Sequence, residues 1–205
     1  MKAMKQSLVL VCMLSFTACV FGQVKSPSPD PDQLAAVSLT PISGNERLRW
    51  TVKSTVGTGS LVTGVFSAAW GTAINEPEEY GPHYGGFAKR YGMRLTGVAA
   101  SNSIEAGAGA IWKEDPRYVS SNRGGIIERV KYAGRMTFFA RRADGTIAPA
   151  YARYIAVPTS NFISNSWRVE SESSVSSALV RTGLGFAGRF VGNVIHELWG
   201  EGQAH

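Results

Sequence analysis

The chain has 205 residues, of which 44% are hydrophobic, and a formal net charge of +6. This length fits one domain of ordinary size after removal of an export signal. A charge this mild favours anionic neighbours such as lipid head groups, but it is far below that of a nucleic-acid-binding domain, so nucleic acid is excluded as a partner.

Residues 1–22 have the three parts of a cleavable signal peptide. Lys2 and Lys5 form a basic start, residues 7–19 are uncharged and largely apolar, and small residues follow. The apolar part is too short to span a bilayer comfortably, because spanning takes about 20 residues. We therefore predict export with cleavage before Gln23, and an uncleaved anchor or a buried first helix is the alternative.

The mature protein is expected to contain no thiol. Cleavage before Gln23 removes Cys12 and Cys19, the two cysteines of the chain, so neither a disulfide nor a cysteine–metal site can form. The residues before Cys19 weakly resemble a lipoprotein signal, and lipidation of Cys19 is the alternative. We expect a periplasmic or envelope-associated protein.

Residues 23–44 are predicted to be a flexible leader. They contain four prolines among Ser, Asp and Thr, a composition that resists packing. The folded domain is predicted to cover residues 45–200. It begins near Ser43, which has capping-box spacing to Glu46.

The first helix is predicted from Arg47 to about Asn75, where residues 75–82, with two prolines and a glycine, are a strong stop signal. Its part from Ser54 to Asn75 carries no charge. The many Thr, Ser and Gly residues there argue against full insertion in a membrane. We prefer a soluble bundle with this helix in its core, and an integral membrane protein is the alternative.

Three glycines of this helix lie on one face. Gly57, Gly64 and Gly71 are spaced seven residues apart. Each glycine costs a helix about 1 kcal/mol relative to alanine. We therefore expect close packing against this face to compensate the cost.

Further helices are predicted at His83–Trp112, Ile126–Arg142, Ile147–Val157, Thr159–Trp167 and Glu172–Trp199. Pro158 separates two of these segments, and Asp144-Gly145 forms a turn. A β-hairpin around that turn, from residues 136–139 and 146–148, is the alternative to helix; we prefer helix because the preceding apolar residues keep helical spacing. The predicted fold is all-α, a single compact bundle of about five Gly/Ala-rich helices.

Two motifs for nucleotide or metal chemistry fail on their context. Residues 183–188 match G-x-G-x-x-G, but the Ser- and Glu-rich stretch before them does not resemble the strand that this motif needs. Close helix packing, continued at Gly192, explains these glycines better. His196-Glu197 begins like H-E-x-x-H, but Gly200 occupies the position of the second ligand. We expect no metal and no cofactor.

Enzymatic chemistry lacks a recognisable set of residues. The chain has no G-x-S-x-G, and neither a nucleophile–base pair nor a metal set assembles from the sequence. His196, near a helix C-terminus, is explained by its favourable interaction with the helix dipole. A non-enzymatic protein is therefore favoured.

Glu105 is the single charge among residues 95–112, where Ala, Gly and Ile surround it. Such a carboxylate is either buried with a raised pKa, as in active sites, or held in a structural ion pair. We favour the ion pair, with Arg94, Arg117 and Arg135 as candidate partners. Glu105, Asp115 and Arg117 are the candidate ligand-binding residues.

Four segments together resemble a known group of proteins: Phe87–Gly92, Glu114–Tyr118, Arg129–Phe139 and Asn193–Trp199. They are similar to an uncharacterised family of small exported bacterial proteins with an Asp-Pro-Arg-Tyr motif. The resemblance covers about residues 64–200 and departs after Glu197, where the family's proline is missing. It implies a helical domain and no known activity.

The Asp-Pro-Arg-Tyr motif has a structural role on chemical grounds. Asp115 can cap a turn, Pro116 fixes its own φ, and Arg117 can clamp a carboxylate or carbonyl groups. We therefore expect a junction between helices first and a ligand site second.

The sequence favours an exported non-enzymatic envelope protein, a structural or interaction module near a membrane. A membrane surface or another envelope protein is the expected partner, because small-residue helix faces and a positive balance suit both. The alternative is an exported small-ligand binder or enzyme with a pocket around Glu105, Asp115 and Arg117.

Overall fold

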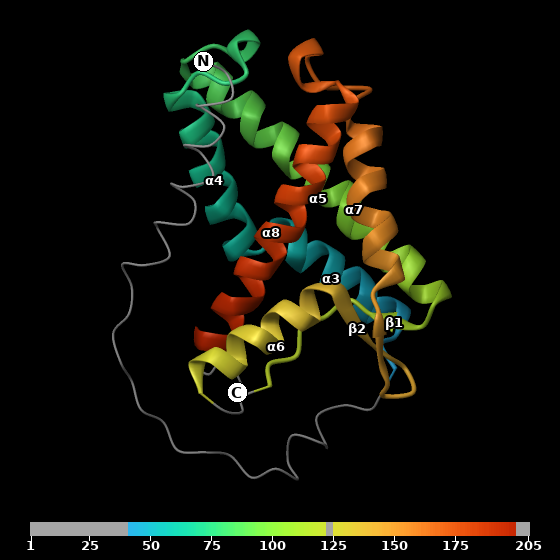
Figure 1. Cartoon of the computed structure of the whole chain (residues 1–205). Coiled ribbons are helices and arrows are strands. Elements are labelled where there is room, and N and C mark those ends of the chain that lie inside the picture. The colour runs from blue at the N-terminus through green and yellow to red at the C-terminus, as the bar shows by residue number, and fades with distance from the viewer. Residues whose placement is uncertain (1–40, 122–124, 200–205) are drawn as a thin grey trace. The chain divides into compact units, whose positions relative to one another are not determined.

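The computed structural model describes residues 41–121 and 125–199. These residues form an all-α bundle with a small sheet at one end, which confirms the predicted fold class (Figure 1). The signal peptide, Cys19 and most of the leader lie outside the described residues. The predictions about them stay predictions.

Six α-helices and three strands make up the described part of the chain. The helices are α3 (Gly44–Val56), α4 (Thr58–Ala73), α5 (Tyr84–Ile111), α6 (Ile126–Phe138), α7 (Tyr151–Ser164) and α8 (Val175–Trp199). The strands β1 (Glu114–Asp115), β2 (Phe139–Arg142) and β3 (Ile147–Pro149) form an antiparallel sheet in the order β1-β2-β3. Two 3-10 turns cover Glu78–Tyr80 and Glu170–Glu172.

The long helix α5 organises the bundle. It packs against α3, α4 and α7, and α8 packs against α6 and α7 (Figure 1). The buried apolar side chains are mostly alanines, whereas the largest fully buried ones are Glu105, Glu197, Thr137 and Ser164. The interior is therefore small and polar, and many Val, Leu and Ile side chains lie on the outside.

The predicted first helix is broken at Gly57. Its start is as expected, because Ser43 and Glu46 form both hydrogen bonds of the capping box. At Gly57 the backbone is extended, with φ −69° and ψ 156°, and this residue ends α3 and begins α4. Glycine has little preference for helical dihedrals, so a break costs least there. The uncharged stretch Ser54–Asn75 is therefore two helices.

The glycine face of α4 packs closely, as expected, at two of its three positions. A Cβ on Gly64 would lie 2.8 Å from the Tyr91 ring, and a Cβ on Gly71 would lie 3.0 Å from Cδ of Arg90. Both neighbours belong to α5. Gly57 lies at the break between α3 and α4, so backbone geometry explains this glycine and close packing of the glycine face does not.

The helix predicted at Ile126–Arg142 ends at Phe138. A hairpin does form around the predicted turn, but its first strand is Phe139–Arg142 and not residues 136–139. Strands β2 and β3 pair around Asp144-Gly145. Gly145 has φ 82°, and Oδ1 of Asp144 accepts from the amide of Thr146 at 2.9 Å. The turn chemistry thus outweighs the helical spacing of the preceding residues.

Two other boundaries differ from the sequence prediction. Pro158 lies inside α7 and does not divide it, because the helix has buried residues on both sides, among them Val157 and Ser160. The last helix begins at Val175 and not at Glu172, because Oγ of Ser174 accepts from the amide of Ser177 at 3.0 Å and provides an N-cap.

Gly86→Ala is expected to lower the free energy of unfolding by about 1–3 kcal/mol through overpacking. A Cβ on Gly86, in the first turn of α5, would meet the carbonyl oxygens of Tyr80 and Gly81, which cannot move without the loop. The measurement is urea unfolding followed by circular dichroism.

Gly92→Ala is the matched control in the same helix. Nothing lies within 4 Å of a Cβ at Gly92, so this change should raise stability by up to about 1 kcal/mol through helix propensity alone. If Gly86→Ala proved as stabilising as Gly92→Ala, the close approach of the 80–81 loop to α5 would be wrong.

Candidate functional site

The structure places Glu105 in a buried ion pair. Its side chain is 1% exposed, and Oε1 accepts from Nε of Arg153 at 3.0 Å. Oε2 accepts from Nη2 of Arg189. The structural pair favoured from the sequence is therefore present. Its arginines come from α7 and α8.

The three arginines expected to hold Glu105 have other partners. Arg94 donates to the carbonyl oxygen of Ser60 at 3.1 Å, and Arg117 pairs with a carboxylate next to it in the chain. The guanidinium of Arg135 lies over the ring of Phe139. The prediction of these partners was wrong, because an ion pair across a bundle depends on helix packing and leaves no spacing signal in the sequence.

The Glu105 cluster also binds the end of α6, while the Arg189 side chain stays 21% exposed. Nη1 of Arg153 donates to the carbonyl oxygens of Met136 at 2.9 Å and Thr137 at 2.7 Å, at the end of α6. Burial lowers the pKa of Arg189 to about 10, and the neighbouring Glu105 carboxylate opposes this shift. Arg189 thus keeps its charge near neutral pH, and the cluster joins four helices.

Asp115 and Arg117 form a local clamp, separate from Glu105. The amide of Arg117 donates to Oδ1 of Asp115 at 2.9 Å, which is the turn that the Asp-Pro-Arg motif predicts. Nη2 of Arg117 lies 2.7 Å from Oδ2 of Asp115, and Nη1 lies 3.3 Å from Oε1 of Glu46. Hydrogen bonding to Asp115 raises the pKa of Arg117. Asp115 and Arg117 line one small cavity with Arg153 and Arg189, the partners of Glu105, but Glu105 itself does not line it.

Glu114, which the sequence analysis missed, caps α7. Its carboxylate accepts from the amides of Tyr151 at 3.1 Å and Ala152 at 3.0 Å. These are free amides of the first helical turn, where a negative charge is favourable. The carbonyl oxygen of Glu114 accepts from Nη2 of Arg47 at 2.8 Å, so this residue fixes α3 as well.

Glu197 holds a second buried carboxylate site that the sequence analysis missed. The hydroxyls of Tyr118 and Ser120 each donate to Oε2 at 2.7 Å, and the Ser121 amide donates to Oε1 at 3.0 Å. Burial acts to raise the pKa of Glu197, but the hydrogen bonds outweigh it and hold this pKa below its ordinary value. The ring of the neighbouring His196 lies on Tyr118, with centroids 5.3 Å apart.

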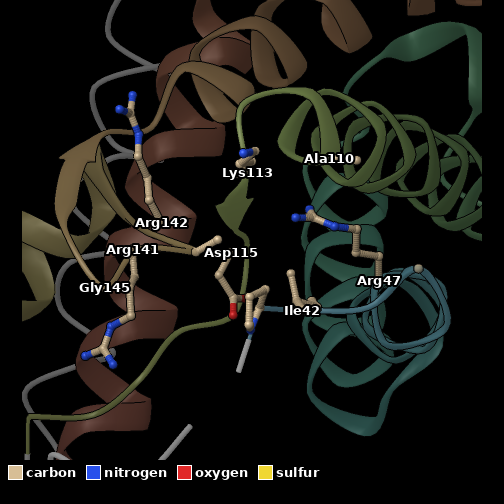
Figure 2. A pocket seen from close by; sticks show the side chains of 11 residues that line it. Ile42, Arg47, Ala110, Lys113, Asp115, Arg141, Arg142 and Gly145 are labelled. Atoms are coloured by element: carbon tan, nitrogen blue, oxygen red, sulfur yellow. The ribbon is translucent and has the colours of Figure 1, made fainter. Parts of the chain in front are cut away.

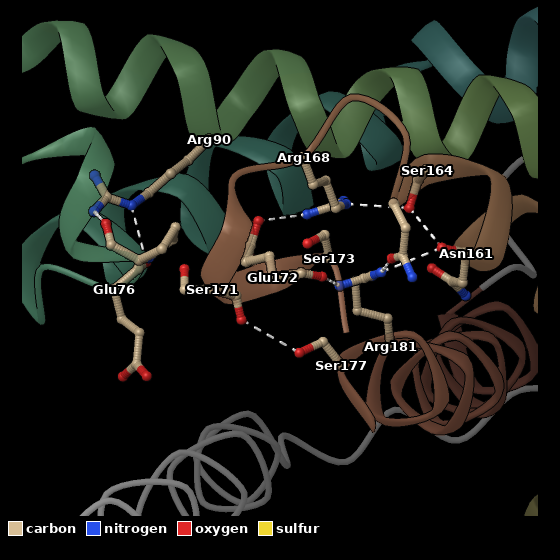
Figure 3. Close-up of polar contacts among 12 residues, drawn as sticks. Glu76, Arg90, Asn161, Ser164, Arg168, Ser171, Glu172, Ser173, Ser177 and Arg181 are labelled. Carbon is tan, nitrogen blue, oxygen red and sulfur yellow. Dashed lines mark hydrogen bonds and ion pairs between the residues drawn. The ribbon is translucent and has the colours of Figure 1, made fainter. Parts of the chain in front are cut away.

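Two arginines hold the loop between α7 and α8 (Figure 3). Arg168 donates to Oε2 of Glu172 at 2.8 Å, and Arg181 donates to the carbonyl oxygen of Glu172 at 2.6 Å. Arg181 also reaches the carbonyl oxygen of Asn161 at 3.2 Å. These guanidinium groups therefore have a structural role.

One cleft of about 440 Å³ lies where α3, the end of α5 and the β2–β3 hairpin meet (Figure 2). Of the three candidate residues only Asp115 lines it. Its other charged lining residues are all basic: Arg47, Lys113, Arg141 and Arg142. A cleft with this lining can hold an anion.

The glycine motif considered in the sequence has a structural place. Residues 183–188 lie in the middle of α8, without the strand that nucleotide binding requires. Of their glycines, Gly185 lies against Val157, whereas Gly183, Gly188 and Gly192 have open space around them. Close packing within the described chain therefore explains one of these four glycines.

Among the described residues, no group of three or more His, Cys, Asp or Glu side chains gathers as metal ligands would. In the same residues no helix is both long enough and apolar enough to cross a membrane. No family model, curated protein or solved structure matches this chain. The resemblance to the exported family therefore stays an expectation.

Proposed function

We propose that this protein is an exported, non-enzymatic envelope protein, a structural or interaction module that lies against a membrane surface. The observation that carries the proposal is that helix α8 directs its charged side chains into the bundle and its apolar side chains outward. Its charged residues Arg181, Arg189 and Glu197 all bind groups of the bundle. The face left exposed is mostly apolar, and its polar residues, Ser176 and His196, lie near the two ends of the helix.

Between Ser176 and His196, the exposed face of α8 is built from apolar side chains and glycines. Its exposed large residues are Val175, Leu179, Val180, Leu184, Val191 and Ile195. A helix at the surface of a soluble protein normally directs its charges to water and its apolar residues to the core. The reverse order favours an apolar neighbour outside the chain.

Helix α4 supports the same reading from another part of the bundle. It contains no charged residue, packs against α5, and exposes Val62 and Val65. Because α4 and α8 rest on different helices, an extended apolar layer suits both faces better than one narrow partner does. We therefore favour the interfacial region of a lipid bilayer as the neighbour, held at its surface by apolar contact and the mild positive charge.

Vesicle binding tests this proposal. The wild-type protein is expected to float with anionic vesicles. Leu179→Glu/Leu184→Glu is expected to lower the partition coefficient at least about tenfold, because two leucine side chains no longer enter the bilayer. Ser103→Glu/Gly107→Glu is the control, since it adds the same two charges at exposed sites of α5.

Two results would contradict the proposal. Equal binding by both variants would show that α8 does not face the lipid. A wild-type protein that ignores vesicles but forms a dimer, which the α8 variant loses, would mean that a second copy covers this face.

A further inference from the structure

The cleft beside β1 has no role in the proposed contact of α4 and α8 with a membrane. Pro41, Ile42 and Arg47 border it from α3 and the residues before it, Ala110 borders it from α5, and Gly145 borders it from the hairpin turn (Figure 2). Its volume of about 440 Å³ is in the range of small-ligand sites.

The lining of this cleft carries an excess of positive charge. Arg47, Lys113, Arg141 and Arg142 all border it, and Asp115 is the one acidic residue in the lining. The Asp115 carboxylate is already bound by the guanidinium of Arg117. Asp115 also attracts Arg47, and Asp144 attracts Arg142. The four basic groups of the lining still outnumber these two carboxylates, so an attraction for an anion is left.

The basic residues of the cleft differ from the other arginines of the bundle. Arg153, Arg168 and Arg189 each pair with a carboxylate at short range. By contrast, Arg47, Lys113, Arg141 and Arg142 form no ion pair with any residue in the described part of the chain.

Arg142 and Lys113 keep donor groups that have no hydrogen-bond partner in the described part of the chain. The guanidinium of Arg142 lies over the Tyr151 ring at 5.9 Å, and its Nε is buried without a hydrogen-bond partner among the described residues. Lys113 is exposed and follows the end of α5 with a positive φ of 56°, which turns the chain toward β1.

Arg47 and Arg141 complete the basic lining. Arg47 is buried and donates only to carbonyl oxygens, those of Ala106 and Glu114. Burial is the main cause of its lowered pKa, a sign that its charge lacks full compensation. Figure 2 shows Arg141 and Arg142 leaving β2 in opposite directions, so positive charge flanks the strand on both faces.

We infer that this cleft binds a phosphate group, carried by a small molecule or by a lipid head group. A guanidinium and an ammonium from different elements can donate to separate phosphate oxygens, and charge-assisted hydrogen bonds of this kind are the strong ones. The inference stands on the cleft alone and does not rest on the exposed face of α8.

Titration calorimetry with inorganic phosphate and with glucose 6-phosphate tests the soluble source, and vesicles with or without phosphatidylglycerol test the lipid source. We expect the protein to bind a soluble phosphate compound, phosphatidylglycerol or both. Lys113→Gln and Arg142→Gln are each expected to weaken this binding about tenfold, because each removes one charge-assisted hydrogen bond.

Lys131→Gln is the matched control. Lys131 is an exposed cation on α6 outside the cleft, so its removal changes the net charge by the same amount. The inference is wrong if neither phosphate nor phosphatidylglycerol binds the folded wild-type protein. It is equally wrong if Lys131→Gln weakens binding as much as Lys113→Gln, because attraction would then be nonspecific.

Discussion

Replacing Glu105 by Gln is expected to lower the free energy of unfolding by about 3–5 kcal/mol. The change removes the one carboxylate that faces Arg153 and Arg189, and it leaves both guanidinium groups in the interior without a counter-charge. Breaking a buried pair from one side costs more than the pair itself contributes, because the remaining charge stays desolvated. Urea unfolding at neutral pH, followed by circular dichroism, measures the loss.

Two further variants separate this effect from a general loss of charge. Glu46→Gln also removes a carboxylate paired with an arginine, but this pair is exposed to solvent. Glutamine can keep the capping-box hydrogen bond from the Ser43 amide, so the loss of stability should be small. Replacing Glu105, Arg153 and Arg189 together by Leu, Met and Met should recover much of the stability, because no buried charge is then left alone. If Glu105→Gln unfolded at the wild-type urea concentration, the ion pair would be solvated and the interior less closed than described.

The parts of the fold that could be predicted from the sequence depend on local signals. Ser43 and Glu46 are three residues apart, so their capping box can be recognised without knowledge of the fold. The stop at residues 75–82 likewise follows from two prolines and a glycine, and α4 ends just before it. Such signals act within one helical turn, which is why they survive in the structure.

The errors arise where packing decides between local options. Several glycines of the predicted helix permit a break, but the helix breaks at Gly57 and continues through Gly64 and Gly71. Pro158 leaves intact a helix that it should interrupt. In α7 the buried residues on each side of Pro158 outweigh the hydrogen bond that proline cannot donate. Neither outcome can be read from residue preferences alone.

The candidate site was predictable in one respect and not in the other. A single carboxylate among small residues indicates that Glu105 is buried and paired, and it is. Its partners are 48 and 84 residues away in the chain, and no periodic pattern connects such positions. The cleft is harder still, because its basic residues come from α3, the segment after α5 and β2, which meet only in the folded protein.

Replacing Glu197 by Gln is expected to lower the free energy of unfolding by about 3 kcal/mol at neutral pH. The carboxylate accepts hydrogen bonds from Tyr118, Ser120 and Ser121, and so attaches the segment after β1 to α8. An amide offers one accepting oxygen and two donors in place of two accepting oxygens, so at least one of these partners loses its bond. Glu128→Gln, at an exposed site of α6, is the charge-matched control and should change stability little.

The pH dependence of this difference gives the sharper test. Hydrogen bonds hold the pKa of Glu197 in the folded protein below the ordinary value of 4.5, despite burial, whereas the unfolded chain has that ordinary value. A carboxyl whose pKa is lowered by folding binds protons more readily in the unfolded state, so its stabilisation is present above about pH 4.5 and is lost as the pH falls through the lower, folded-state pKa. The stability gap between wild type and Glu197→Gln should therefore be constant near neutral pH and narrow on acidification. A gap that stays constant through the acid range would mean that this carboxylate titrates alike in both states, and the hydrogen-bonded site at Glu197 would be wrong.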